Sequence, residues 1–465
     1  MKDLTRGSIS RHLLSMSLQM GAGLLLQTLY FFVDLYFVSR LGDAAIAGVS
    51  AAGTVFFVVI ALTQALGVGT VALVSHAVGR QDRAEANHLF NQSVSLAVLC
   101  AAITLAGGYG FARPYMRLFG ADEATVVQGV AFLEGYIPGM ALQFAIVVMA
   151  SALRGTGIVK PAMIVQALTV VVNAALAPVL IAGWGTGHAF GARGAGIATS
   201  LAVAVGVAVL AFYFVRLEHY VRFDRALWRP RAATWWRMLH VGVPAGAEFL
   251  LLGLFIALMY WAMRPFGAEA QAGFGIGSRI NQMLFVPAMA LAFAVPAVAG
   301  QNFGARQADR VRETFRVAVT CTTVVMAALT IIAQWKAELL ARVFTAEPGV
   351  IAVAALYLHY VSWNFVAAGI VFCCSGLFQA MGNTWPSLGS SAFRLLIFGV
   401  PGFWLATRPG FQIRQIFMLS VATNVVQALV SVLLLRAQLR RRLAFSASTP
   451  GASRARAGGS PSLAA

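Results

Sequence analysis

Charged residues are scarce in this sequence, and their scarcity excludes an ordinary soluble protein. Asp, Glu, Lys and Arg make up 11% of the 465 residues, whereas roughly 25% is usual in soluble domains. Hydrophobic residues reach 59%, more than a soluble fold could keep away from water. The same figures exclude a disordered chain, because disorder requires low hydrophobicity. The composition therefore predicts an integral membrane protein.

Cysteine and histidine are also few, and phosphate-binding motifs are absent. The chain has 4 Cys and 7 His, and the cysteines show neither metal-ligand spacing nor a disulfide pattern. No Gly-rich loop ending in Lys-Ser or Lys-Thr occurs, so ATP is not expected to supply energy directly. A membrane enzyme would need His, Asp and Glu clustered within the spans, and no such motif is evident. We therefore expect no cofactor and no enzymatic activity.

Acidic residues are few beside basic ones: 16 Asp and Glu against 34 Lys and Arg, for a net charge of +18. In a soluble protein this excess would suggest nucleic acid. Here the basic residues are spread over many short loops, so no nucleic-acid partner is expected. Placing the N-terminus in the cytoplasm puts most loop Lys and Arg on the cytoplasmic side of the bilayer. This distribution predicts that both termini are cytoplasmic.

Long hydrophobic runs are what the sequence has in abundance. A bilayer core needs about 20 apolar residues per helix. A window of that length predicts twelve spans, an even number that agrees with two cytoplasmic termini. They cover residues 13–38, 45–78, 89–111, 126–153, 160–182, 194–216, 238–263, 270–302, 316–335, 349–380, 387–406 and 414–436.

The two halves of the chain are related by an internal repeat. Gly42 corresponds to Gly267 and Gly79 to Gly304, both at an offset of 225 residues. Residues 157–161, which end in Pro161, fall on residues 382–386, which end in Pro386. Each half holds six spans, so both halves enter and leave on the same side. The repeat is therefore parallel, with its axis along the membrane normal.

The repeat predicts an all-α integral membrane fold: twelve transmembrane helices in two parallel-repeat six-helix bundles around a central cavity. Rocking one bundle against the other would expose that cavity alternately to the two sides, as in a secondary transporter. The expected organisation is a cytoplasmic N-terminal segment, an N-lobe, a cytoplasmic inter-lobe loop, a C-lobe and a disordered cytoplasmic tail. These parts cover residues 1–12, 13–216, 217–237, 238–440 and 441–465, in that order.

Four segments carry a resemblance to a known family. Two large families share the plan of two six-helix bundles, the major facilitator superfamily and the multidrug and toxin extrusion (MATE) family. The motifs here resemble the MATE family, and the polar first span is most similar to its DinF-like bacterial branch. The segments that carry the resemblance are LLQTLYFFVDLYFVSRLGDAAIAG (25–48), SHAVGRQDRAEA (75–86), SALRGTGIVKP (151–161) and IGSRINQMLFVPAMALAFAVPAVAGQNFGA (276–305).

The resemblance implies a function. MATE proteins are secondary active antiporters that export amphiphilic, mostly cationic small molecules such as drugs and toxins, driven by inward H⁺ or Na⁺ flux. We expect this chain to do the same in the bacterial inner (plasma) membrane, as a monomer within the lipid bilayer. Its partners would be the amphiphilic cations.

Asp34 lies well inside the first predicted span. An ionised carboxylate at the bilayer centre costs about 2.5–3.5 kcal/mol on insertion scales, so it needs a function or a partner. Tyr30 and Gln27 precede it by four and seven residues, so the three share one helix face. The resemblance implies that Asp34 is the coupling-ion or proton site. The alternative is a structural carboxylate paired with a nearby donor.

Asn173 and Thr199 are the other candidate coupling residues. Family members often carry Asn-x-x-x-Asp-Pro in the fifth span, but here Ala177 stands where the second carboxylate would be. A sodium site needs several hard oxygen ligands, whereas one carboxylate suffices for a proton. The loss favours H⁺ over Na⁺ at Asp34. The alternative for Asn173 and Thr199 is helix–helix packing.

The substrate cavity is expected to be apolar and aromatic, because Met and aromatic side chains accommodate varied shapes and attract cations. Glu248 would bind a substrate cation, relay protons, or pair with Arg279 or Arg394. The two arginines are interpreted as partners or snorkelling groups. The alternative for most cavity candidates is ordinary helix packing. The candidates are Gln27, Tyr30, Glu248, Met259, Tyr260, Met283 and Trp363.

Other functions remain as alternatives. A flippase for lipid-linked precursors, from the same superfamily, predicts a more cationic cavity and extra helices. A non-transporting membrane scaffold would leave the buried Asp34 without a task. The antiporter is favoured over both.

Overall fold

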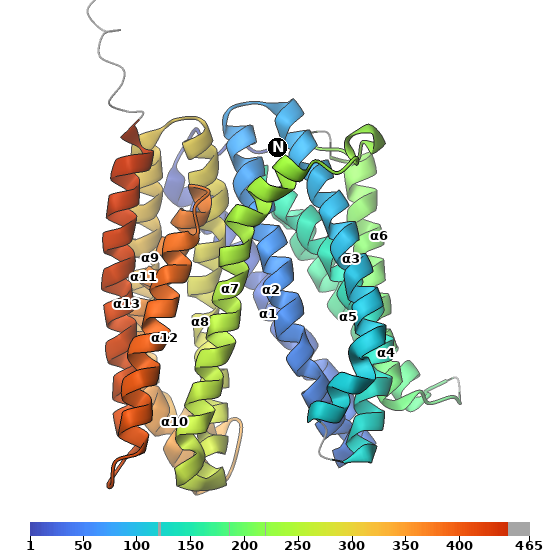
Figure 1. Cartoon of the computed structure of the whole chain (residues 1–465), viewed down its shortest axis with the longest axis vertical. Helices are drawn as coiled ribbons and strands as arrows, with labels where there is room; N and C mark the ends of the chain where they lie inside the picture. The colour runs from blue at the N-terminus through green and yellow to red at the C-terminus, as the bar shows by residue number, and fades with distance from the viewer. Residues whose placement is uncertain (120–121, 186, 219, 445–465) are drawn as a thin grey trace, which may run out of the picture.

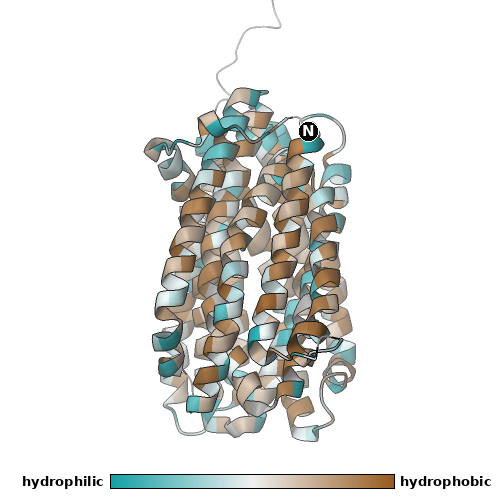
Figure 2. Cartoon of the chain, turned by 90° about the vertical axis from the view of Figure 1, so that its right-hand side faces the viewer, coloured by the Kyte–Doolittle hydropathy of each residue, from teal (hydrophilic) through white to brown (hydrophobic). Residues whose placement is uncertain are grey.

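The computed structural model describes residues 1–119, 122–185, 187–218 and 220–444, apart from the side chains of residues 29–35, 39, 43, 54, 56, 57 and 119. Within this part the regular structure is helical throughout, with no strand. Hydrophilic residues gather at the two ends of the molecule, and hydrophobic residues dominate the helices between them (Figure 2). This distribution is the one that a bilayer imposes on a membrane-spanning helical bundle.

Six helices form the first bundle, here called the N-lobe. They are α1 (Ile9–Val38), α2 (Asp43–Gly79), α3 (Arg83–Phe119), α4 (Glu123–Gly155), α5 (Lys160–Ala182) and α6 (Gly191–Arg216), with a short 3-10 turn, η1 (Ser39–Leu41), between the first two.

Seven helices form the second bundle, the C-lobe. They are α7 (Ala232–Met263), α8 (Gly267–Gly304), α9 (Ala308–Arg342), α10 (Pro348–Val361), α11 (Asn364–Ala380), α12 (Trp385–Ala406) and α13 (Ile413–Arg442). The 3-10 turns η2 (Arg225–Leu227) and η3 (Arg264–Phe266) lie in the inter-lobe segment and between α7 and α8.

The helices account for twelve spans. In the described part of the chain, nine helical stretches are long and apolar enough to cross a membrane, and a tenth is made by α10 and α11, which are bent by 59°. One of the nine, Ala232–Gly304, contains both α7 and α8, which run in opposite directions (Figure 1). The remaining span is α1, whose 30 residues are about 45 Å long at 1.5 Å per residue.

Helix starts agree with local chemistry. Proline at the first turns of α5, α10 and α12 needs no backbone donor there and has a helical φ. Asp122 caps α4, because its carboxylate accepts a hydrogen bond of 2.7 Å from the Thr125 N–H. That bond lowers the pKa of Asp122 from its ordinary value.

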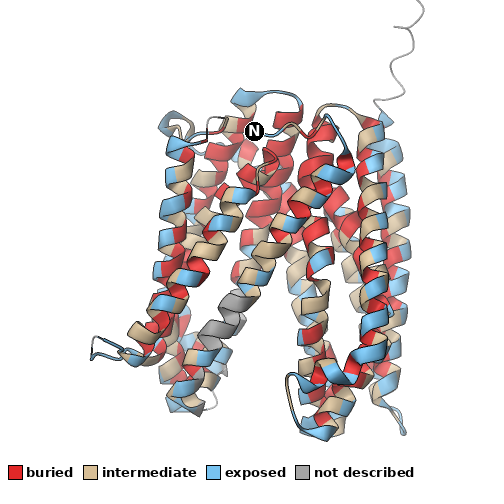
Figure 3. Cartoon of the chain, turned by 180° about the vertical axis from the view of Figure 1, so that it is seen from behind, coloured by how far each residue is buried: buried red, intermediate tan, exposed pale blue. Residues whose placement is uncertain are grey.

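The two lobes meet at one end of the molecule and diverge toward the other (Figure 1). The end where they meet holds the N-terminus and is called the closed end below. There α2 packs against α7 and α8, and α1 packs against α8. Buried residues are concentrated around this junction (Figure 3). The lobes therefore form an inverted V with its apex at the closed end.

Glycines at equivalent positions of the repeat make the junction possible. A Cβ on Gly79 would lie 2.0 Å from the Gln301 carbonyl oxygen, and one on Gly304 would lie 2.3 Å from the His76 carbonyl oxygen. Residues 76 and 301 are also 225 positions apart, so the two contacts are related by the repeat. The offset in the sequence thus corresponds to a pseudo-two-fold axis in space, across which α2 and α8 approach closely.

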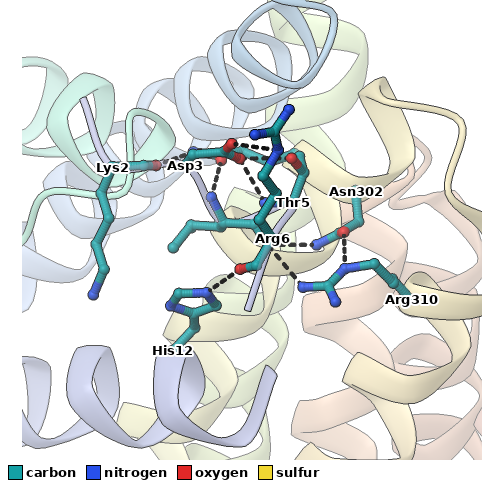
Figure 4. A network of polar contacts seen from close by, with 9 residues as sticks. Lys2, Asp3, Thr5, Arg6, His12, Asn302 and Arg310 are labelled. Atoms are coloured by element: carbon teal, nitrogen blue, oxygen red, sulfur yellow. Dashed lines mark hydrogen bonds and ion pairs between the residues drawn. The ribbon is translucent and has the colours of Figure 1, made fainter. Parts of the chain in front are cut away.

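The N-terminal segment adds to the closed end. The expectation was a cytoplasmic segment of twelve residues, but α1 already begins at Ile9 and Leu4 is fully buried. The Leu4 carbonyl accepts hydrogen bonds from Asn302 Nδ2 at 3.2 Å and Arg310 Nη2 at 3.3 Å (Figure 4). Lys2 N–H donates to the Thr156 carbonyl of the N-lobe. The segment therefore joins the two lobes.

Candidate functional site

The N-lobe contains the predicted coupling site. Asp34 and Tyr30 fall within α1, but their side chains lie outside the described residues. Gln27, on the same helix, is exposed. Val38, one turn after Asp34, belongs to a buried cluster with Ala177 of α5. The structure thus places this turn of α1 beside the segment of α5 where the second carboxylate is missing.

Asn173 and Thr199, the other two candidate coupling residues, lie in contact with each other. Both are buried, and Asn173 Nδ2 donates to Thr199 Oγ1 at 3.4 Å. The Thr199 hydroxyl in turn donates to the Ala195 carbonyl at 3.0 Å. Ala177 is fully buried among apolar neighbours. This part of the N-lobe therefore offers an amide and a hydroxyl, with a methyl group at the family's second carboxylate position.

The C-lobe encloses a cavity of about 270 Å³. Its lining comes from α7, α8, α10, α11, α12 and α13. Apolar and aromatic side chains cover much of it, as expected for a small-molecule site. The polar side chains among them are Glu248, Ser278, Asn281, Gln282, Tyr357, Asn364, Ser375, Ser391, Arg394, Ser420, Asn424 and Gln427.

Glu248 projects into this cavity from α7. Its Oε2 accepts a hydrogen bond from the Ser375 hydroxyl at 3.2 Å, and Ser387 faces the same carboxylate. No ion pair within 4.0 Å joins Glu248 to Arg279 or Arg394. Arg279 is exposed, and Arg394 lies over the Phe255 ring at 4.2 Å from its centroid. Among the described residues, Glu248 therefore has no arginine partner, contrary to one of the interpretations drawn from the sequence.

Of the other predicted substrate residues, some line the C-lobe cavity and others lie outside it. Met259 lines the C-lobe cavity with Glu248, whereas Tyr260, Met283 and Trp363 are not among its lining residues. The Tyr260 ring meets Phe274 edge-on, and Tyr260 is 39% exposed. Trp363 is 66% exposed at the break between α10 and α11. Met259 occupies the C-lobe position that the offset of 225 residues makes equivalent to Asp34.

A second repeat-related pair, not predicted from the sequence, lies at the closed end. His76 Nε2 lies 2.6 Å from the Ala380 carbonyl oxygen, and Gln301 Nε2 donates to the Gly155 carbonyl at 2.9 Å. Positions 76 and 301 are equivalent, as are 155 and 380. Each bond crosses from one lobe to the other. The signal that could have revealed them is a polar residue at the same place in both halves.

Comparisons with known proteins identify the family. A profile of the MatE family matches residues 20–179 and 244–405. This chain belongs to the MatE family. The two matched stretches begin and end at nearly the offset of the internal repeat, so the family pattern is present in both lobes. The chain is accordingly a multi-pass membrane transporter of the MATE type, as the sequence predicted.

Curated relatives of this MATE protein are similar over most of their length. The "FAD transporter" of Shewanella oneidensis is 26% identical over 86% of this chain and 89% of its own. The "Probable multidrug resistance protein YoeA" of Bacillus subtilis is 26% identical over 78% and 80%. The "Probable multidrug resistance protein NorM" of Thermotoga maritima is 26% identical over 82% of each chain.

Solved structures share the fold. "Crystal structure of MATE in complex with MaL6" superposes with a TM-score of 0.89, at 24% identity over 94% of this chain and 98% of that one. "Outward-facing conformation of a multidrug resistance MATE family transporter of the MOP superfamily" gives a TM-score of 0.88 at the same identity and coverage. The likeness extends to both lobes. Membership of the DinF-like branch stays a prediction from the sequence.

Proposed function

We propose that this MATE protein is a secondary active antiporter that exports amphiphilic small molecules, mostly cations, in exchange for inward H⁺ at Asp34. The observation that carries the proposal is the asymmetric junction of the lobes. They are joined at one end by repeat-related contacts and diverge at the other (Figure 1). With the closed end in the cytoplasm, as the basic loops predict, the molecule is open to the outside.

Alternating access requires that the lobes can separate at the closed end and come into contact at the opposite end. The contacts at the closed end hold the outward-open state, and an inward-open state must break them and form others at the opposite end. Proton and substrate drive the exchange only if they prefer different states of the protein. A proton taken up from outside at Asp34 would favour release of the exported molecule. The direction of transport thus depends on the N-in orientation.

The surroundings of Asp34 support a proton rather than sodium. Near this turn of α1, Thr199 supplies a hydroxyl oxygen, which accepts a hydrogen bond from Asn173 Nδ2 and donates to the Ala195 carbonyl, and Asn173 supplies a side-chain amide oxygen. Ala177 adds no ligand. Sodium would need several hard oxygens to replace its water, whereas a single carboxylate can load and release a proton. The bacterial inner membrane, with cytoplasmic termini, is the location that this coupling requires.

Two observations weigh against the flippase alternative. The described helices account for the twelve spans without additional ones. The C-lobe cavity carries Glu248 as well as Arg394, so it is not uniformly cationic. The relatives named above include a drug-resistance protein and a transporter of FAD. Export of small molecules is therefore the function proposed.

The test is transport of ethidium, a lipophilic cation, into proteoliposomes. A pH gradient is imposed in sodium-free buffer, and a sodium gradient is imposed separately at matched pH. We expect only the pH gradient to drive uptake by the wild type, and Asp34→Asn to abolish it. Asp309→Asn serves as the matched control, because Asp309 has a 95% exposed side chain at the start of α9.

Three outcomes separate the possibilities. Uptake driven by sodium alone would contradict proton coupling. Full proton-driven uptake by Asp34→Asn would remove Asp34 from the mechanism while leaving the exporter intact. If neither gradient moves ethidium or other cations, the drug-exporter proposal is wrong and the flippase gains weight.

A further inference from the structure

The C-lobe cavity contains buried polar atoms that have no partner. Among the described residues, Asn281 Oδ1, Asn364 Oδ1 and Gln427 Oε1 make no hydrogen bond, and neither do Glu248 Oε1 and Arg394 Nε. All five residues line the same cavity. Buried polar groups are normally paired, since leaving one without a partner is destabilising. A group of them around one space indicates that something polar fills it, either water or a ligand.

Arg394 is the unusual member of this set. A guanidinium stays charged under all physiological conditions, and within a span it needs an anion, a carbonyl or water. In the described structure no carboxylate lies within 4.0 Å of Arg394. Its face is covered by the Phe255 ring, which holds the group by a cation–π contact. Among the described residues, the Nε donor of the guanidinium makes no hydrogen bond.

The repeat shows that the fold itself does not require these polar residues. The N-lobe positions equivalent to Glu248, Asn364, Arg394 and Gln427 hold Gly23, Gly139, Thr169 and Ala202, in that order. The same bundle architecture is therefore built without charge at these positions. Burying these polar side chains is energetically unfavourable, and the N-lobe folds without them. Binding of a ligand therefore explains their presence better than a role in folding does.

The cavity thus holds one acidic and one basic side chain, Glu248 and Arg394, and no ion pair within 4.0 Å joins the two. A simple cation bound at Glu248 would share the cavity with the fixed positive charge of Arg394. A simple anion at Arg394 would in turn meet Glu248. A molecule that carries both an ammonium or iminium group and a carboxylate satisfies both side chains and enters the membrane interior with no net charge. Arginine also matches carboxylate geometry with two parallel hydrogen bonds.

We propose that the C-lobe cavity binds zwitterionic substrates, with the substrate acid on Arg394 and its cationic group toward Glu248. The side-chain amides around the cavity complete the polar contacts, and its aromatic lining holds the apolar body of the molecule. This inference rests on the proposed export function, because it names a substrate class for the same transporter. It departs from the expectation of mostly cationic substrates.

The experiment compares two dyes that differ only in the acid. Rhodamine 110 carries a cationic ring system and a free carboxylate, and rhodamine 123 is its methyl ester. Fluorescence anisotropy gives the Kd of each dye for the purified, detergent-solubilised full chain, without any ion gradient. We expect the wild type to bind rhodamine 110 at least about tenfold more tightly, the usual effect of a charge-assisted hydrogen bond.

The Arg394 variants decide the matter. R394Q should weaken rhodamine 110 binding by at least about tenfold, and should tighten rhodamine 123 binding because a positive charge has left the cavity. R394K should restore part of the preference. R279Q removes an exposed arginine and should keep the wild-type ratio of Kd values. Since both dyes are measured on the same sample, a loss of folded protein cannot imitate a change in their ratio.

The outcomes are separate from those of the transport test. The zwitterion site is wrong if the wild type binds both dyes with equal affinity or binds neither of them. It is also wrong if R394Q changes both Kd values equally. Each of these results would stand even if a pH gradient drives ethidium export. If the preference depends on Arg394 but no gradient drives export, the site stands and the antiporter proposal is wrong.

Discussion

Adding one methyl group at the junction of the lobes should open the closed end. In Gly79→Ala, the new Cβ would lie 2.0 Å from the Gln301 carbonyl oxygen, whereas ordinary contacts begin at 3.4 Å. The obstacle is backbone, so α2 and α8 must separate by on the order of 1 Å. The His76 and Gln301 bonds to the opposite lobe, at 2.6 and 2.9 Å, lie next to this point and would be stretched or lost.

The size of the effect follows from those two bonds. Each is worth about 0.5–1.5 kcal/mol net, so their loss removes about 1–3 kcal/mol from the outward-open state. That range corresponds to a shift of roughly 5–150-fold in the population ratio of the two states. A protein that populates the inward-open state only slightly would then populate it measurably.

Double electron–electron resonance can detect the shift. Spin labels at Arg80→Cys and Arg306→Cys, in a background without the native cysteines, report the distance across the closed end, since both side chains are exposed there. Gly79→Ala should add or enlarge a longer-distance population. The control is Gly53→Ala on the same helix, where a Cβ would meet nothing within 4 Å. An unchanged distribution in Gly79→Ala would show that the glycine contact does not hold the lobes together.

Two further predictions concern the N-lobe. Ala177→Asp restores the carboxylate of the family pattern at a buried position near Asn173. A sodium gradient should therefore drive ethidium uptake by this variant, but not by the wild type or by Ala177→Asn. Equal responses of the three proteins to sodium would refute the explanation given for proton coupling. Asp122→Ala removes the cap of α4. Because the hydrogen bond from Thr125 lowers the pKa of Asp122 in the folded state, its stabilisation is present at pH 7 and is lost as the pH falls through that lowered value. Melting temperatures in detergent should therefore differ between Asp122→Ala and the wild type at pH 7 and converge at acid pH, and a difference that persists there would contradict the cap.

The site was only partly predictable. Asn173 and Thr199 were named as candidates for one site because of the resemblance to the family, and the structure shows a hydrogen bond between them. Arg394 was interpreted as a partner or a snorkelling group. Whether an arginine within a span meets a carboxylate, the membrane surface or a cavity depends on helices far away in the sequence, and no local pattern records it.

The twelve spans, the parallel repeat and the family can all be read from the sequence. Hydrophobic length sets the spans, and a repeat leaves its offset in the residues that both halves must keep, such as Gly79 and Gly304. Tertiary structure alone decided how the lobes are closed. Leu4 is fully buried, and its carbonyl accepts hydrogen bonds from Asn302 and Arg310, about three hundred residues away. A short polar segment gives no sign of such burial, because its partners exist only once both bundles have formed.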